Sequence, residues 1–150
     1  MHRIMGLDIG DKRIGVAVSD PSQILASPLK TIVRKDDQSA ILEIAALVTQ
    51  RSIGRLVIGL PYLMNGSVGE QARKVMEFTG GIKEKTGVEI VMQDERLTSF
   101  TAGQMLREAD KKRKRLKKEI DAAAATVILQ AHLDEIAAEG QISQQERPSL

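Results

Sequence analysis

Apolar residues dominate the first twenty positions in two runs that a short polar turn separates. The runs are Arg3–Ile9 and Arg13–Ser19, with Gly10-Asp11-Lys12 between them. Such a pattern predicts two strands joined as a hairpin. A third strand is expected at Leu29–Val33, which ends on three β-branched residues.

The rest of the chain alternates between helical and strand patterns. The patterns predict helices at Ser39–Gln50, Glu70–Lys85, Thr98–Asp110 and Glu119–Glu139, and strands at Arg55–Leu60 and Val88–Met92. The order βββαβαβαα is typical of an α/β sandwich with a mixed sheet. At 150 residues the chain suits a single domain. We expect that domain to span residues 1–139, followed by a polar, flexible C-terminal tail at 140–150.

The composition excludes several kinds of catalytic and metal-binding site. Cysteine is absent, which excludes disulfides, thiolate catalysis and cysteine-bound metal clusters. The two histidines lie at opposite ends of the chain, without the spacing of a zinc pair. No uncharged apolar run is long enough to cross a membrane or to act as a signal peptide. We therefore expect a cytoplasmic protein with no membrane partner.

Basic charge is concentrated in one segment. Seven of the chain's 22 basic residues, and no acidic residue, lie within eight positions. They are Lys111, Lys112, Arg113, Lys114, Arg115, Lys117 and Lys118. Such a segment predicts binding to a polyanion through its phosphates, with steep salt dependence. The alternative is a solvated connector that binds nothing in particular.

Three groups of carboxylates occupy positions that favour a common site. Asp8 shares one face of its strand with Ile4 and would be costly there without a partner or a cation. Asp94 and Glu95 follow the last predicted strand, and Asp121 lies in the first turn of the last helix. Ligand sites in α/β sheets favour the carboxyl ends of parallel strands.

Each acid also has a simpler interpretation. Backbone amides of the Gly10 turn could satisfy Asp8, the bend at 94–96 could be a surface ion pair, and Asp121 suits a helix N-terminus. If the acids do converge, their repulsion calls for a multivalent cation. Oxygen ligands with no histidine or cysteine nearby favour Mg²⁺ or Mn²⁺. Two such ions could support phosphodiester hydrolysis without a nucleophilic side chain.

Other polar residues near these acids allow two interpretations. Lys12 and Arg13 could simply end the hairpin or, together with Arg96, could neutralise a phosphate. Asn65-Gly66 is a common turn dipeptide, and it could also belong to a loop that the substrate approaches closely. The chain has only three aromatic residues, which favours duplex or folded nucleic acid over stacked single strands.

Four motifs, taken together and in order, resemble the YqgF family of bacterial proteins, which are related to the Holliday-junction resolvase RuvC. They are Gly6–Asp20, Val57–Pro61 with Asn65-Gly66-Ser67, Asp94–Ser99 and Ile120–Gln130. The similarity extends from about residue 3 to residue 139. The first motif alone would be weak, whereas the four in sequence are highly specific.

The resemblance implies a ribonuclease H-like three-layer sandwich, with a five-stranded mixed sheet and flanking helices. It implies that Asp8, Glu95 and Asp121 are the catalytic, metal-binding acids, and Asp94 is a candidate fourth ligand. Arg96 and the Asn65-Gly66 loop match other signature positions of the family. Ala124 stands where the wider resolvase pattern has a second acid, so tight binding of two metal ions is in question.

The leading hypothesis is a metal-dependent nuclease. The resemblance implies processing of the 5′ end of precursor 16S ribosomal RNA, or cleavage of branched DNA such as Holliday junctions. We expect structured RNA as the substrate, ribosomal precursor particles as partners, and a monomer or weak homodimer. One alternative is a non-catalytic nucleic-acid-binding or ribosome-assembly module. Another is a nucleotide-binding phosphotransferase of the actin and sugar-kinase type, which a single short domain disfavours.

Overall fold

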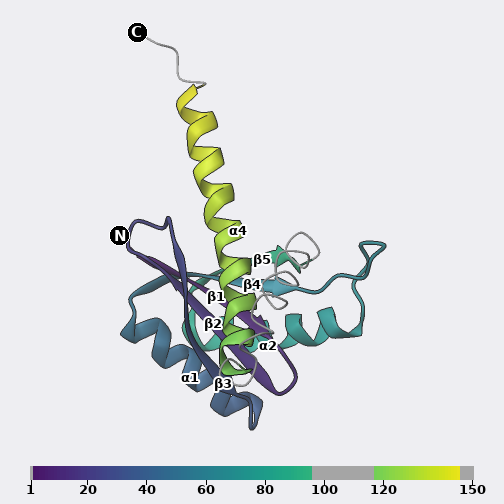
Figure 1. Cartoon of the computed structure of the whole chain (residues 1–150). Helices are drawn as coiled ribbons and strands as arrows, with labels where there is room; N and C mark the ends of the chain where they lie inside the picture. The colour runs from purple at the N-terminus through teal and green to yellow at the C-terminus, as the bar shows by residue number, and fades with distance from the viewer. Residues whose placement is uncertain (1, 96–116, 146–150) are drawn as a thin grey trace.

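The computed structural model describes residues 2–95 and 117–145, with side chains up to 95 and from 122 to 140. Within these residues a five-stranded sheet has the strand order β3-β2-β1-β4-β5 (Figure 1). The strands are β1 Arg3–Ile9, β2 Arg13–Ser19, β3 Ala26–Val33, β4 Ile53–Leu60 and β5 Glu89–Asp94, and the helices are α1 Asp37–Gln50, α2 Glu70–Thr86 and α4 Lys117–Gln145.

The sheet is mixed, as predicted. Strand β1 pairs antiparallel with β2 and parallel with β4, and β4 pairs parallel with β5. The hairpin strands β1 and β2 have the predicted bounds. Strand β3 begins three residues before the predicted Leu29, because Ser27 and Pro28 also pair with β2. Proline is tolerated there since β3 is an edge strand.

The two faces of the sheet bury different helices, which gives three layers. Met5 and Leu7 of β1 belong to the core beneath α1 and α2. Ile4 belongs to the core beneath α4, together with Leu129. A Cβ on Gly6 would lie 2.7 Å from the Cβ of Leu129, so α4 crosses β1 at a point that admits no side chain. The predicted three-layer sandwich is confirmed.

Helix α4 is longer than predicted. It was expected to end at Glu139, and it continues through Gly140 to Gln145, so the predicted start of the tail is helical. One glycine costs a helix about 1 kcal/mol, and three of the next five residues are glutamines, which favour helices. The predicted helix Thr98–Asp110 and residues 146–150 lie outside the described residues. In the described part of the chain, no helix has the length and apolar character needed to cross a membrane.

His132 is a buried titratable group between α4 and the sheet. Its side chain is 7% exposed, and Nε2 lies 3.3 Å from Nη1 of Arg55. Burial, and secondly the charge of Arg55, lower the pKa of His132, while Glu135, Glu139 and Glu89 act in the opposite direction. The fold therefore favours a neutral imidazole at this position.

We predict that His132 makes the protein less stable as the pH falls below 6.5. The unfolded chain binds a proton near that pH, whereas the folded chain resists it, so the free energy of unfolding decreases with falling pH. Urea unfolding between pH 5 and 7 should show a shallower pH dependence for His132→Gln. The exposed His2 provides His2→Gln as the control for the exchange of an imidazole for an amide away from the core. Equal slopes for wild type and His132→Gln would contradict this account.

Candidate active site

Asp8 lies at the end of β1 and on the face of the sheet that α4 covers. This placement follows from the alternation of Ile4, Gly6 and Asp8 along the strand. Its partner on β2 is Gly15, which has no side chain to crowd the carboxylate. On the other side, Leu7 pairs with Ile58 of β4, so the next residue pair brings Asp8 beside Gly59.

Glu95 follows β5 directly, and its side chain lies over Gly59. A Cβ built on Gly59 would be 2.5 Å from Oε1 of Glu95 and 2.6 Å from Cδ1 of Ile128. The carboxylate therefore occupies the space that any other residue at position 59 would fill. The sheet thus brings together Asp8 and Glu95, two of the predicted acids, although 86 residues separate them in the chain.

The carboxyl groups of Asp8 and Glu95 share a hydrogen bond. Burial raises the pKa of Glu95 to about 8, and the charge of Asp8, this hydrogen bond and the charge of Asp94 all act in the same direction. A hydrogen bond between two carboxyl groups needs a proton on one of them, and Glu95 holds it at neutral pH. Two ionised carboxylates at this distance would repel each other, and either a proton on Glu95 or a bound cation removes that repulsion.

Asp121 belongs to α4, but its side chain lies outside the described residues. The direction of α4 can be followed from its contacts with β4. His132 contacts Arg55 near the start of β4, and Ile128 lies at Gly59 near its end. Earlier residues of α4 therefore lie further toward the carboxyl ends of the strands, where Asp8 and Glu95 are. Asp121 is one helical turn before the fully buried Ala125.

The described side chains alone do not complete a metal centre. Among residues 2–95 and 122–140, no group of three or more histidine, cysteine or acidic side chains has the geometry to hold a metal ion. Asp94 is half-buried and its charge acts on Glu95. The donor set within these residues consists of carboxylate oxygens, which suit a hard divalent cation.

The predicted nucleic-acid contacts fall in several places. Lys12 and Arg13 are exposed, at the turn between β1 and β2. The Oδ1 atom of Asn65 accepts hydrogen bonds from the backbone N–H and the hydroxyl of Ser67, and Gly66 has a φ of 86°. Asn65 thus stabilises a local turn. Arg96, Lys111, Lys112, Arg113, Lys114 and Arg115 lie outside the described residues, and Lys117 and Lys118 begin α4 without described side chains.

Gly59 was not among the predicted site residues. The available signal was a glycine inside an otherwise apolar, buried strand, which often marks a close approach of another group. What approaches cannot be inferred from the strand itself, because Glu95 reaches Gly59 only through the pairing of β4 with β5.

Comparison with known proteins identifies the family. A family model described as "RuvX: Holliday junction resolvase" matches residues 2–135. The chain belongs to the RuvX family. This confirms the similarity to YqgF proteins that the four motifs indicated.

RuvX relatives match most of the chain. A protein of Clostridioides difficile is 46% identical over 132 residues, covering 88% of this chain and 94% of that protein. A protein of Clostridium botulinum strain Hall is 46% identical over 134 residues, covering 89% and 98%. Both carry the name "Putative pre-16S rRNA nuclease".

Solved structures confirm the fold of this RuvX chain. RuvC of Thermus thermophilus, in complex with a Holliday junction, matches with a TM-score of 0.61 and 14% identity, covering 93% of this chain and 97% of that one. The fowlpox virus resolvase in complex with junction DNA has a TM-score of 0.55 and 12% identity, covering 89% and 98%. The predicted RuvC-like, ribonuclease H-like architecture is therefore correct.

We predict that Glu95→Gln stabilises the metal-free protein above pH 8. Because the pKa of Glu95 is raised when folded, the wild type loses stability as pH rises from about 4.5 toward 8. A glutamine donates to Asp8 without that loss. The gain should be of the order of 1–2 kcal/mol after allowance for solvent screening. Urea unfolding in EDTA at pH 5 and pH 8.5 measures it.

Glu84, exposed on α2, supplies the matched control for this experiment. Glu84→Gln should leave the free energy of unfolding nearly unchanged at both pH values. A Glu95→Gln variant that is less stable than wild type at pH 8.5 would contradict the shared-proton arrangement.

Proposed function

We propose that this RuvX protein is a metal-dependent nuclease that hydrolyses phosphodiester bonds in precursor 16S ribosomal RNA. The observation that carries the proposal is the hydrogen-bonded pair of Asp8 and Glu95 at the carboxyl ends of parallel strands. Family membership and the names of relatives that are 46% identical support this reaction and this substrate. Branched DNA is the second substrate to test, because the family description names Holliday junctions.

The carboxylates fit a divalent cation, Mg²⁺ or Mn²⁺. Asp8 and Glu95 would hold it, with Asp94 beside them and Asp121 approaching from α4. Such a cation supplies a water of lowered pKa and stabilises the charge that develops on the phosphate oxygens. The raised pKa of Glu95 supports this assignment, because crowded carboxylates lose their mutual repulsion when a cation binds.

The protein's own residues control the proton at this site. Glu95 holds a proton at neutral pH, and it must release that proton before both carboxylates can act as ligands. Cation binding should therefore strengthen as the pH rises toward 8. The apolar side chain of Ile128 lies over Gly59, beside the carboxyl group of Glu95.

Basic residues would bind the substrate's phosphates. Lys12 and Arg13 are exposed at the turn that follows Asp8 by a few residues. Arg96 directly follows Glu95 in the chain, and the basic segment at 111–118 precedes the turn of α4 that contains Asp121. We assign these groups to contacts with folded RNA, in the cytoplasm and on ribosomal precursor particles, with the protein acting as a monomer or weak homodimer.

We predict that wild type cleaves a precursor 16S RNA fragment with Mg²⁺ or Mn²⁺ and that Asp8→Asn does not. Loss of a metal-binding carboxylate removes several kcal/mol of transition-state stabilisation, equal to about a thousand-fold in rate or more. A gel assay on the RNA fragment and on a four-way DNA junction measures both substrates side by side. The exposed Asp134 on α4 gives the control Asp134→Asn, which should retain activity.

The outcomes of this assay separate the candidate functions. Full activity of Asp8→Asn would contradict the assignment of the site. Binding of RNA by the wild type without any cleavage would favour a non-catalytic assembly module. Cleavage of the junction alone would transfer the proposal from RNA to branched DNA.

We also predict that Gly59→Ala lowers cleavage by about a hundred-fold, since displacement of a catalytic group by about 1 Å can cost that much. The added methyl group would overlap Oε1 of Glu95 and Cδ1 of Ile128, and overpacking should cost about 1–3 kcal/mol of stability. Gly80→Ala on α2 is the matched control, because a Cβ there meets nothing within 4 Å. It should keep full activity. Equal activity of Gly59→Ala and wild type would contradict the role of Gly59 in leaving space for the Glu95 side chain.

A further inference from the structure

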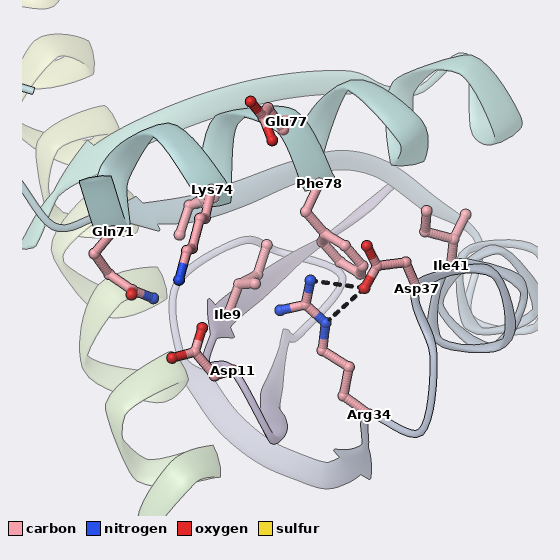
Figure 2. A pocket seen from close by; sticks show the side chains of 10 residues that line it. Ile9, Asp11, Arg34, Asp37, Ile41, Gln71, Lys74, Glu77 and Phe78 are labelled. Carbon is pink, nitrogen blue, oxygen red and sulfur yellow. Dashed lines mark hydrogen bonds and ion pairs between the residues drawn. The ribbon is translucent and has the colours of Figure 1, made fainter. Parts of the chain in front are cut away.

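Arg34 directly follows β3, and its side chain contacts the turn after β1, helix α1 and helix α2. Its Nη1 donates to the carbonyl oxygen of Gly10 at 2.9 Å, and its Nε and Nη2 donate to Oδ1 of Asp37 at 3.1 and 2.8 Å. Its guanidinium carbon lies 4.3 Å from the centroid of the Phe78 ring (Figure 2). The side chain is only 15% exposed. Arg34 therefore joins the turn after β1 to α1 and α2.

The backbone of Arg34 binds the same turn. Its N–H donates to the carbonyl oxygen of Lys12 at 2.9 Å. Within the turn, the N–H of Gly10 donates to the carbonyl oxygen of Arg13 at 2.9 Å. Two bonds from one residue thus hold both ends of the three-residue turn Gly10-Asp11-Lys12.

Beyond the buried Ile9, the turn faces open space on the side of α1 and α2. A cavity of about 320 Å³ lies there, between the turn and the start of α2. Ile9 and Asp11 line it on the side of the turn, and Gln71 and Lys74 line it from α2 (Figure 2). Arg34 connects the turn to α1 at the edge of this space, in addition to the hairpin bond from Gly10 to Arg13.

The position of this turn affects the candidate active site, because Asp8 lies just before it and Lys12 belongs to it. Asp8 lies two residues before Gly10, and Lys12 is the exposed cation at the tip. A shift of the turn would change the end of β1, and with it the position of Asp8 relative to Glu95. All three guanidinium nitrogens of Arg34 bond within the protein, so its described contacts support the turn and α1.

We propose that Arg34 is a positioning residue for the reaction proposed above, acting through the Gly10-Asp11-Lys12 turn on Asp8. The proposal rests on the proposed nuclease function. It assigns to the Arg34 side chain an effect on turnover and not on substrate affinity, because that side chain binds Gly10, on the Asp8 side of the turn, whereas Lys12 is bound by the backbone N–H of Arg34, which a substitution leaves in place.

The test compares Arg34→Ala with wild type in steady-state cleavage of the RNA fragment. We expect kcat to fall about a hundred-fold, as for a 1 Å misplacement, with KM within about two-fold of wild type. The cavity beside the vacated site should admit methylguanidinium, which should restore kcat at least about ten-fold. Arg73→Ala is the control, because Arg73 is also an arginine ion-paired with an acid three residues away, Glu70, but is 64% exposed. It should change neither constant and show no rescue.

Three outcomes would overturn the proposal. They are an unchanged kcat, a rise in KM that accounts for the whole loss, or a loss of kcat without rescue by methylguanidinium. If Arg34→Ala does not fold, Arg34→Lys replaces it, since a lysine ammonium cannot form the planar fork to Asp37 and Gly10 together. Full activity of Arg34→Lys would then reject the proposal.

Hydrogen exchange distinguishes this proposal from the proposed function. The amide of Gly10 should exchange at least about ten-fold faster in Arg34→Ala and at the wild-type rate in Arg73→Ala. If wild type cleaves no substrate, the nuclease proposal fails, while the exchange result still decides whether Arg34 restrains the turn. An unchanged exchange rate at Gly10 would refute that restraint.

Discussion

The structure depends on one unfavourable contact, the approach of the Asp8 and Glu95 carboxyl groups to hydrogen-bonding distance. Burial and neighbouring charge raise the pKa of Glu95 to about 8, so the fold opposes two negative charges at this point. A protein gains nothing in stability from such a pair. Its presence at the carboxyl ends of three parallel strands supports the proposal that both carboxylates bind a cation.

The surrounding fold brings the carboxyl groups of Asp8 and Glu95 together. Glycines at 15 and 59 leave space on the two strands beside Asp8, and Gly6 lets α4 lie directly on β1. Helices α1 and α2 cover the face of the sheet opposite to α4. Arg34 connects them to the turn that follows Asp8. Packing on both faces of the sheet thus positions Asp8 and Glu95.

Much of this could be predicted from local pattern. Strands β1 and β2 were predicted with their bounds, because alternation and a polar turn are local signals, and the same alternation placed Asp8 on the face of Ile4 and Gly6. The start of β3 was missed because Pro28 suggested a loop, and the end of α4 was missed because the polar residues from Gly140 onward suggested a frayed tail. The contacts of Gly59 and Arg34 could not be predicted, since each joins segments that only the folded sheet and helices bring together.

The most direct test of the central claim is the titration of the Glu95 carboxyl group by carbon-13 NMR, with and without Mg²⁺. We expect a pKa near 8 in EDTA, and a value lowered toward the ordinary range of glutamate when Mg²⁺ is added, since the cation replaces the shared proton. An ordinary pKa that Mg²⁺ does not change would show that Asp8 and Glu95 do not form a cation site.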